Sequence, residues 1–444
     1  MRSASLPTAY VEPLYTAAEM RAAEEGHEVQ QLMERAGRAV ADAILTRFPA
    51  GRTFAAVCGR GANGGDGRIA AELLRSNGWE ERSLGEADVV VDALFGTGFR
   101  GAPREEAVQQ IRAMNDVPAP VVAVDIPSGV DASTGEVPGE AVVAELTVTF
   151  HGRKVGNEVA PGRFHRGDVV VADIGLEPAE TEHALVTPDI LELVPRRKPG
   201  DTKYTAGSVL VVGGSPGLTG AACLTAEAAF RADAGYVAVA APRESLPVVE
   251  SRLLEAVKRP LEEVWDAVAR AGALAIGPGL GREQAVLVRR LLEETDVPAV
   301  VDADALYELE PFERAAETVL TPHSGELGRL LGEEASSVDA HRLEALRRAV
   351  ERFGCVVLLK GEGTLVGAPG AGALVCGGFA VLATAGTGDV LTGVIAAFLA
   401  KGMDARLAAA AGSVAHTQAA LAAPYRSGLV ASDLLTSLPR VLDA

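Results

Sequence analysis

The sequence predicts an α/β protein made of two doubly wound domains, and two observations indicate this class. Short runs rich in Val, Ala and Ile recur along both halves of the chain, and each is ended by glycine or proline. Such runs are typical of parallel strands that are covered on both faces. Amphipathic segments of helical periodicity separate them, and this alternation favours a parallel sheet with helices on each side.

The first half predicts helices around three buried strands. Thr16 and Glu19 have the spacing of a capping box, which starts a helix. Apolar side chains then recur with the period of one helical face: Val29, Leu32, Met33, Ala36, Val40 and Ile44. The predicted strands are TFAAVCG, DVVVDALFG and PVVAVDIPSG (residues 53–59, 88–96 and 120–129), and GRIAAELLRSNG (67–78) is a predicted helix between the first two.

A change of composition marks the predicted domain boundary. From Asp173 the chain becomes polar, charged and proline-containing, and we place the boundary at about Ala184, which gives domains 1–184 and 185–444. A second series of buried strands follows: SVLVVGGS (208–215), YVAVAAP (236–242), ALAIGPGLG (273–281), PAVVDADAL (298–306), TVLTPH (318–323) and CVVLLKG (355–361).

Bulk composition excludes several classes of function. The formal net charge of −19 over 444 residues argues against a nucleic-acid-binding protein, which normally shows a basic face. The N-terminus has no apolar signal-peptide core, and no run of about 18 apolar residues predicts a membrane span. The four cysteines have no paired spacing for zinc or redox chemistry, so we expect reduced thiols in a cytoplasmic protein: Cys58, Cys223, Cys355 and Cys376.

Glycines and carboxylates follow the strands of the first half. In GRGANGGDG (59–67), the glycines allow close approach to a phosphate, while Asn63 and Asp66 offer oxygens. Asp92 and Asp125 end the next two strands. Oxygen donors from Asn63, Asp92 and Ser128 suit a hard cation. The alternative is that the carboxylates only cap turns and the glycines only form tight loops.

In the second half, Gly386, Thr387, Gly388 and Asp389 stand where an apolar run becomes a helix. Unpaired amides and the helix dipole at such a start attract anions. Asp389 is either a helix cap or a base beside an anion site. His323 and Lys360 follow neighbouring strands; a structural histidine and a solvated lysine are the alternatives.

The order of these motifs resembles a known family. Gly-Gly-Ser, Gly-Pro-Gly-Leu-Gly, Asp-Ala-Asp, Thr-Pro-His-x-Gly-Glu, Lys-Gly and Gly-Thr-Gly-Asp are similar to the ADP-dependent NAD(P)H-hydrate dehydratases, which have a ribokinase-like fold. LMERAG, NGGDG, DALFGTG and DIPSGVDASTG resemble the Rossmann-like NAD(P)H-hydrate epimerase domain. Together they resemble the bifunctional nicotinamide-nucleotide repair enzymes, whose members epimerise the R and S hydrates of NADH and NADPH and dehydrate the S hydrate with ADP, giving AMP and phosphate.

The resemblance implies roles in the second half. Asp389 would be the base that takes the hydroxyl proton, and Glu326 would organise Mg²⁺. The hydrate would contact Ala221, Gly279, Gly281, His323 and Asp389. The adenine nucleotide, ADP with ATP as the alternative, would contact Lys360, Gly361, Glu362, Gly363, Thr364, Gly386, Thr387 and Gly388. The His323-x-x-Glu326 variant of the kinase Asn-x-x-Glu motif argues against an ordinary small-molecule kinase.

The resemblance also implies roles in the first half. K⁺ would be held by Asn63, Asp92 and Ser128. The hydrate would contact Asn63, Gly64, Gly65, Asp66, Gly96, Thr97, Gly98, Phe99, Arg100, Gly101, Ala102 and Asp125. Two features depart from the family pattern: Ala62 replaces an asparagine, and only nine residues separate Gly78 from Asp88, too few for the usual extra strand and helix. This domain is therefore trimmed, and a weakened epimerase or a non-catalytic module is the alternative. A homo-oligomer is expected.

Overall fold

The computed structural model describes residues 7–443, which form two compact units. The N-terminal unit comprises Pro13–Ala184 with Asp339–His341, and the C-terminal unit comprises the remaining described residues. The chain passes between them at Ala184, the position of the predicted boundary. The predicted start of the first domain differs, because the described residues up to Glu12 group with the C-terminal unit.

The N-terminal unit is built on a six-stranded sheet in which all paired neighbours are parallel. Its order is β3-β2-β4-β5-β6-β8. The strands are β2 (Thr53–Cys58), β3 (Glu80–Glu81), β4 (Val89–Ala93), β5 (Val121–Val124), β6 (Leu146–Phe150) and β8 (Asp168–Ala172). Two short strands, β1 (Val11–Tyr15) and β7 (Arg153–Lys154), pair separately and in parallel.

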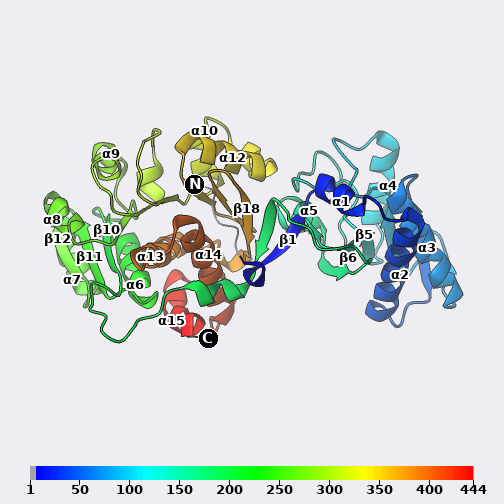
Figure 1. Cartoon of the computed structure of the whole chain (residues 1–444), viewed down its shortest axis with the longest axis horizontal. Coiled ribbons are helices and arrows are strands. Elements are labelled where there is room, and N and C mark those ends of the chain that lie inside the picture. The colour runs from blue at the N-terminus through cyan, green and yellow to red at the C-terminus, as the bar shows by residue number, and fades with distance from the viewer. Residues whose placement is uncertain (1–6, 444) are drawn as a thin grey trace. The chain divides into compact units, whose positions relative to one another are not determined.

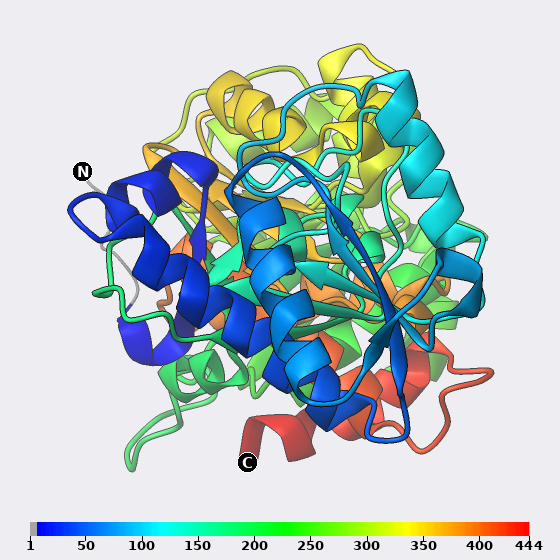
Figure 2. The ribbon, with the colours of Figure 1, turned by 90° about the vertical axis from the view of Figure 1, so that its right-hand side faces the viewer.

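Helices cover this sheet, and α2 and α3 lie side by side (Figure 2). They are α1 (Ala17–Glu24), α2 (Val29–Arg47), α3 (Ala62–Ser76), α4 (Glu105–Asn115) and α5 (Val155–Glu158). The predicted capping box starts α1, since the Thr16 amide donates to Glu19 Oε2 at 2.7 Å. Gly26, at φ +83°, stands between α1 and α2. The predicted apolar stripe of α2 is packed into the core through Ala36, Val40 and Ile44. Val29, predicted as its first member, is 64% exposed at the start of the helix.

The edge of the sheet next to β2 is short. β3 has two residues and is followed by a 3₁₀ turn (Leu84–Glu86), with no α-helix before β4. The spacing between Gly78 and Asp88 predicts no strand here, and this prediction is wrong. The structure has a two-residue strand, in which Glu80 and Glu81 pair in parallel with Thr53 and Phe54. The predicted absence of a further helix agrees with the structure.

The C-terminal unit contains a larger sheet, whose order is β12-β11-β10-β13-β14-β15-β16-β17-β18. Strands up to β16 are parallel, whereas β17 and β18 return antiparallel. The parts of β9 and β1 that belong to this unit follow β18. The strands are β9 (His183–Val186), β10 (Ser208–Val212), β11 (Tyr236–Ala241), β12 (Val257–Pro260), β13 (Ala273–Ile276), β14 (Ala299–Val301), β15 (Thr318–Leu320), β16 (Val356–Leu359), β17 (Thr364–Ala368) and β18 (Ala371–Cys376).

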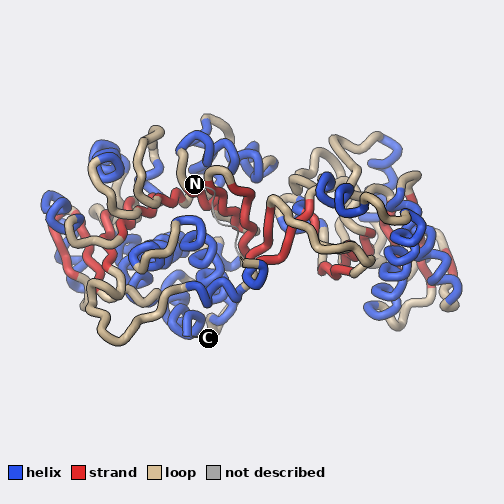
Figure 3. Tube along the Cα trace, viewed as in Figure 1, coloured by secondary structure: helices blue, strands red, loops and turns tan. Residues whose placement is uncertain are grey.

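Helices lie on both faces of this sheet (Figures 1 and 3). In Figure 1, α9, α10 and α12 lie on one side and α6, α13 and α14 on the other. The helices are α6 (Thr219–Arg231), α7 (Leu246–Arg252), α8 (Val264–Val268), α9 (Ala285–Glu293), α10 (Ser324–Leu331), α11 (Ala335–Ala340), α12 (Arg342–Phe353), α13 (Thr387–Ala400), α14 (Ala405–Ala422) and α15 (Ala431–Asp443). Within residues 7–443, no helix has both the length and the apolar character needed to cross a membrane.

Helix α13 is the central helix of the C-terminal unit. Every residue from Val390 to Leu399 is buried, so buried side chains cover all sides of the helix. A helix that is apolar all round is stable only when it is surrounded by other elements. The start of α13 is therefore held firmly at the carboxyl ends of the parallel strands, which is where ligands bind in sheets of this kind.

Candidate functional sites

Asp389 occupies the first turn of α13, as predicted. The preceding Gly386 is in the left-handed conformation at φ +89°, which glycine adopts without strain. None of the described residues donates a hydrogen bond to the Asp389 carboxylate, and α13 has no side-chain cap. The interpretation of Asp389 as a simple helix cap is therefore wrong, and its carboxylate is available to a ligand.

The surroundings of Asp389 suit a group that exchanges protons near neutral pH. Burial raises its pKa to about 7, the Asp302 carboxylate adds to this, and the Lys360 ammonium partly opposes it. Asp304 and Glu326 raise the pKa further. A carboxyl group whose pKa lies near the working pH can both accept and release a proton efficiently.

Lys360 follows β16 and is directed at the buried Asp302, which follows β14. Its Nζ atom lies 2.7 Å from Asp302 Oδ1 and 3.7 Å from Glu326 Oε2. Thr392 of α13 donates to the other oxygen of Asp302 at 2.7 Å. Burial lowers the pKa of Lys360, but Asp302, Glu326 and Asp389 together outweigh it and raise the pKa, so the lysine stays charged. The predicted alternative of a solvated lysine is wrong.

The amides at the start of α13 differ in availability. The Thr387 amide donates to the Thr384 carbonyl at 3.3 Å, so this predicted anion donor is already engaged within its own turn. The Thr387 hydroxyl also donates to the Leu382 carbonyl at 2.7 Å. Among the described residues, no backbone partner accepts from the amides of Gly386 or Gly388. A Cβ atom added at Gly388 would lie 3.6 Å from Lys360 Nζ, so the ammonium group faces this helix start.

Two glycine-rich strand ends bind each other beside this centre. The Ser215 amide donates to the Gly279 carbonyl at 2.7 Å, and the Gly281 amide donates to Asp304 Oδ2 at 3.0 Å. Gly279 and Gly281 have positive φ angles of 60° and 86°. Ala221 lies in the first turn of α6, close to the same loops. The loops that carry the predicted hydrate contacts of this half thus lie together at the carboxyl ends of the parallel strands.

His323 caps α10. Its Nδ1 atom accepts from the Gly325 amide at 3.0 Å, while Glu326 Oε2 accepts from the His323 amide at 2.8 Å. Because Nδ1 is an acceptor, the neutral ring carries its proton on Nε2. The His323 side chain is 55% exposed, so its ring lies at the surface. The structural alternative for His323 is therefore correct as a capping role, and its Nε2 atom lies 3.5 Å from Glu326 Oε1.

The loop after Lys360 is the hairpin turn between β16 and β17. Gly361 and Gly363 have φ angles of +147° and +67°, and the Thr364 hydroxyl donates to the Gly361 carbonyl at 3.2 Å. The buried Arg342 supports it by donating to the Lys360 carbonyl at 3.3 Å. The predicted nucleotide loop, which also contains Glu362, therefore has a defined shape next to the ammonium group.

His416, a buried histidine of α14, is a further residue of this centre that the sequence did not predict. Burial lowers its pKa to about 4, although a hydrogen bond to the Thr387 backbone partly opposes this shift. Lys360 lowers the pKa further, which places the imidazole within electrostatic reach of the catalytic candidates. Its Nε2 atom has no hydrogen-bond partner among the described residues. A histidine inside an Ala-rich helical run gave no local signal of this position.

In the N-terminal unit, the three predicted cation ligands come together. Ser128 donates to Asp92 through its hydroxyl (2.6 Å) and its amide (2.8 Å). Asn63 donates to the Phe95 carbonyl at 2.8 Å, which leaves its Oδ1 as an acceptor. Burial raises the pKa of Asp92 to about 6, while hydrogen bonds from Ser128 and the Leu94 amide oppose the rise. Carboxylate, hydroxyl, amide and carbonyl oxygens here fit a hard cation such as K⁺.

The NGGD segment lies at the start of α3, not in a loop before it. Helix α3 begins at Ala62, so Asn63, Gly64, Gly65 and Asp66 occupy its first turns. The prediction that the helix begins at Gly67 is wrong, because glycines in sequence resemble a loop. Here the glycine is required by packing: a Cβ atom at Gly64 would lie 2.0 Å from the Gly59 carbonyl oxygen.

The segment from Gly96 to Ala102 is a folded turn. The Phe95 and Phe99 rings stack with centroids 4.7 Å apart, and the Phe99 amide donates to the Gly96 carbonyl. Arg100 pairs with Asp131 at 3.2 Å and donates to the Ser133 hydroxyl at 2.9 Å. Arg100 is thus already engaged by the protein. The other predicted hydrate contacts of this segment are Thr97, Gly98, Gly101 and Ala102, and Gly101 has a φ of +70°.

Asp125 directly follows β5 in a backbone conformation that is rare for a residue with a side chain, at φ +69°. Its Oδ1 atom accepts from Lys154 Nζ at 2.7 Å and from the Thr149 hydroxyl at 3.0 Å. Lys154 and Thr149 were not predicted. A usable signal existed: β6 is parallel to β5, so polar residues at the end of the 146–150 strand lie beside Asp125.

Family models match both halves of the chain. The model described as NAD(P)H-hydrate dehydratase matches residues 209–441. The model described as YjeF-related protein N-terminus matches residues 29–84 and 77–156. The two segments of the second match meet at the short edge around β3.

Relatives of known name match nearly the whole chain. A bifunctional NAD(P)H-hydrate repair enzyme Nnr from Moorella thermoacetica is 37% identical, over 93% of this chain and 92% of the relative. The enzyme of that name from Escherichia coli is 35% identical, over 94% of this chain and 90% of the relative. This chain belongs to the family of bifunctional NAD(P)H-hydrate repair enzymes. The predicted family, fold class and enzyme class are confirmed.

A solved structure is similar in fold to the dehydratase half of this repair-enzyme family member. The ADP/ATP-dependent NAD(P)H-hydrate dehydratase from Bacillus subtilis, co-crystallised with ATP/Mg²⁺, has a TM-score of 0.54 and 29% identity. The match covers 58% of this chain and 96% of the Bacillus protein. The C-terminal unit therefore has the fold of the dehydratases of this repair family.

Proposed function

We propose that this chain repairs hydrated nicotinamide coenzymes, and that the C-terminal unit dehydrates the S hydrates of NADH and NADPH with ADP. The observation that carries this proposal is the ligand-accessible Asp389 carboxylate at the start of α13, with a pKa of about 7. Asp389 takes the proton of the hydrate hydroxyl, and the oxygen attacks the terminal phosphorus of ADP. AMP leaves. The phosphate ester then eliminates phosphate while the neighbouring ring carbon loses a proton, which the departing phosphate takes up, and this restores the ring double bond.

The neighbouring cation and amides act on the charge that moves in this reaction. Lys360 and the free amides of Gly386 and Gly388 are placed to stabilise negative charge on the phosphoryl group in transit. Asp389 sits in the same helical turn, so base and anion site have a fixed relative position. His323, Ala221 and the Gly279–Gly281 loop would contact the hydrate, and the hairpin after Lys360 would contact the nucleotide.

A magnesium ion fits the donor set of this centre. Buried carboxylates such as Glu326 combine with phosphate oxygens as Mg²⁺ ligands, and the Bacillus dehydratase was crystallised with ATP/Mg²⁺. When bound, Mg²⁺ would neutralise phosphate charge. The Glu326 side chain is only 10% exposed and its Oε2 atom lies 3.7 Å from Lys360 Nζ, which supports a role beside the nucleotide phosphates.

We also propose that the N-terminal unit interconverts the R and S hydrates. Asp125 and Asp66 would contact the hydrate together with the first turns of α3 and the Gly96–Ala102 segment. A K⁺ ion would be held by Asn63, Asp92 and Ser128 and would fix these loops. The free cysteines and the family suit a cytoplasmic enzyme, and we expect a homo-oligomer, which measurement of mass in solution would test.

Supplying each epimer separately tests both halves. With ADP and the S hydrate, absorbance of the reduced coenzyme should recover, and AMP and phosphate should appear in equal amounts. Without recovery, the dehydratase proposal fails, and a small-molecule kinase becomes the favoured function of the C-terminal unit. With the R hydrate, recovery should exceed the rate of spontaneous epimerisation. Equality with that background would make the N-terminal unit a non-catalytic module.

A further inference from the structure

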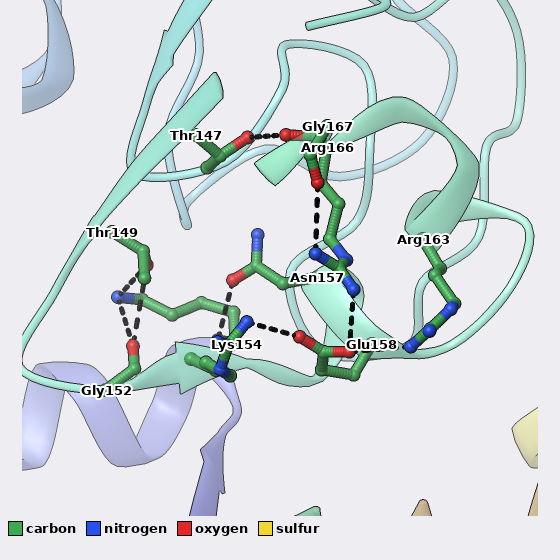
Figure 4. A network of polar contacts seen from close by, with 10 residues as sticks. Thr147, Thr149, Gly152, Lys154, Asn157, Glu158, Arg163, Arg166 and Gly167 are labelled. Carbon is green, nitrogen blue, oxygen red and sulfur yellow. Dashed lines mark hydrogen bonds and ion pairs between the residues drawn. The ribbon is translucent and has the colours of Figure 1, made fainter. Parts of the chain in front are cut away.

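Lys154 is a fully buried lysine in the N-terminal unit that the proposed function does not use. None of its side chain is exposed, and its Nζ atom lies 2.7 Å from Asp125 Oδ1. Nζ also donates to the Thr149 hydroxyl (2.9 Å), the Phe150 carbonyl (2.8 Å) and the Gly152 carbonyl (3.1 Å), part of the network in Figure 4. Burying an ammonium group costs free energy unless it is paired in this way. A neutral residue could fill this position without that desolvation cost.

The segment that carries Lys154 is held rigidly. The Lys154 amide donates to Asn157 Oδ1 at 2.8 Å. The buried Glu158 accepts from Arg163 at 2.8 Å and from Arg166 at 3.3 Å (Figure 4). Lys154 therefore has little freedom to leave Asp125.

The contacts of Asp125 are one-sided. Its Oδ1 atom accepts from Lys154, from Thr149 and, at 3.4 Å, from the Phe150 amide. No described residue donates to its Oδ2 atom. The Asp125 side chain is 10% exposed, so Oδ2 is the carboxylate atom left for a substrate, while Oδ1 is held by the lysine.

Asp66 is the opposite case. Its Oδ1 atom is buried and has no hydrogen-bond partner among the described residues. Burial, Asp125 and the α1 carboxylate Glu24 raise its pKa to about 8, while Arg68 of α3 opposes the rise. Two carboxyl groups within electrostatic reach thus have different surroundings: Asp125 is paired with a lysine, whereas Asp66 has no cation from residues 7–443 bonded to it and keeps its proton up to a pH of about 8. Such a divided pair is typical of acid–base sites.

We infer that Asp125 is the proton acceptor and Asp66 the proton donor of the epimerase site, and that Lys154 is the positioning residue that fixes this order. The inference deepens the proposed epimerase function and rests on it. Among the described residues, nothing donates a hydrogen bond to Asp125 Oδ2 or to the buried Asp66 Oδ1, and only Asp125 is paired with a lysine.

The chemistry balances without any further reactant. Hydration of an enamine places the hydroxyl on the carbon next to the ring nitrogen. Asp125 takes the hydroxyl proton, the carbon–nitrogen bond breaks with its electron pair going to nitrogen, and nitrogen takes the proton of Asp66. The resulting aldehyde group then rotates and presents its opposite face to the nitrogen. Nitrogen then attacks this face and returns the proton to Asp66, while Asp125 returns its proton to the oxygen.

The pH profile of epimerisation in the full-length protein tests this order. Wild type should lose kcat above a pH of about 8, where Asp66 ionises, and in acid, where a carboxylate can no longer accept a proton. Lys154→Met should shift the acid limb to higher pH and lower kcat more than it raises KM. Asp66→Asn should remove the alkaline limb and lower kcat roughly 10²–10⁴-fold.

Dehydration of the S hydrate by the same variants, which uses the other unit, controls for loss of protein. Where Lys154→Met does not fold, Thr149→Val decides, since it removes only the hydroxyl shared by Lys154 and Asp125 and should shift the same limb. An active variant whose kcat keeps the pH dependence of wild type would overturn the inference. A lysine with only a structural role changes the size of kcat but not its pH dependence. A wild type that does not exceed spontaneous epimerisation would instead overturn the proposed epimerase function, and the inference with it.

Discussion

The Lys360 ammonium group lies 2.7 Å from Asp302 Oδ1, and Thr392 of α13 donates to the other oxygen of the same carboxylate. Asp302 therefore links the end of β14 to the lysine after β16 and to the helix that carries Asp389. Because Asp302 is almost completely buried, its charge acts on Asp389 through a medium of low polarity. The negative charge of Asp302 raises the pKa of Asp389, and the lysine limits this rise.

Asp389→Asn should lower the dehydration rate roughly 10²–10⁴-fold, because the amide cannot accept the hydroxyl proton. Nucleotide binding should persist, since the amides and Lys360 are unchanged. Coenzyme recovery and calorimetric titration with ADP measure the two effects. Asp266→Asn is the matched control, because Asp266 is exposed on α8. Wild-type dehydration by Asp389→Asn would remove Asp389 from the mechanism.

Dehydration should depend on the ionisation of Asp389. The base has to be deprotonated, and its pKa is raised to about 7, so kcat/KM should rise tenfold per pH unit below about 7 and level off above it. The same shift costs stability as pH rises from about 4 to about 7, because folding then opposes ionisation. Asp389→Asn should therefore gain stability over wild type at pH 8 by more than at pH 4, on the order of a few kcal/mol. Denaturant titration at both values measures this gain, and a pH-independent difference would contradict the buried state of the carboxylate.

Lys360→Gln should move the dehydration profile to higher pH. The substitution removes the cation that lowers the pKa of Asp389 and leaves Asp302 and Glu326 to raise it. It should also weaken ADP binding, since a positive charge facing the helix start is lost. Rates measured across pH, with ADP affinity measured separately, distinguish the two effects. An unshifted profile with weaker ADP binding would confine Lys360 to nucleotide contact.

Potassium should stabilise the N-terminal unit through Ser128. A ligand that binds only the folded state raises stability with its concentration, so exchange of K⁺ for tetramethylammonium should lower the unfolding midpoint and the epimerisation rate. Ser128→Ala should abolish this response, because it removes a ligand and frees Asp92 from its hydroxyl partner. Ser76→Ala, at the exposed end of α3, is the control. An equal response to K⁺ in both variants would argue against this cation site.

Gly386→Ala should destabilise the C-terminal unit more than Gly402→Ala. Both glycines have nearly the same φ, +89° and +88°, so each substitution costs roughly 1–2 kcal/mol of left-handed strain. At Gly386 the added Cβ would also lie 2.8 Å from Leu224 Cδ1, whereas nothing lies within 4 Å at Gly402. Overpacking should add about 1–3 kcal/mol. Denaturant unfolding measures both variants, and equal losses would contradict the tight packing before α13.

The fold was predictable because its signals are local. Buried strands are continuous apolar runs, and the capping box at Thr16 and the helix start before Asp389 can be identified within a few residues. The beginning of α3 was not predictable in this way. Its glycines have low helix propensity, and only the close approach of Gly64 to the Gly59 carbonyl explains why they are helical.

The partners of the candidate residues depend on tertiary structure. Neighbouring parallel strands predicted that Asp92 and Ser128 would lie close together, but not that Ser128 would donate twice to one carboxylate. The pairing of Lys154 with Asp125 and that of Lys360 with Asp302 each need the path of the chain after a strand. Engagement of the Thr387 amide by Thr384 depends on one turn whose shape the sequence does not specify.

The pairing of Lys360 with a protein carboxylate also bears on the end of the catalytic cycle. If the proposed nucleotide site is correct, an incoming nucleotide shares this cation with Asp302, and the attraction gained by its phosphates is smaller than an unpaired lysine would give. Tight retention of AMP would slow each turnover, because the spent nucleotide must depart before fresh ADP can enter. A lysine already occupied by Asp302 favours that departure.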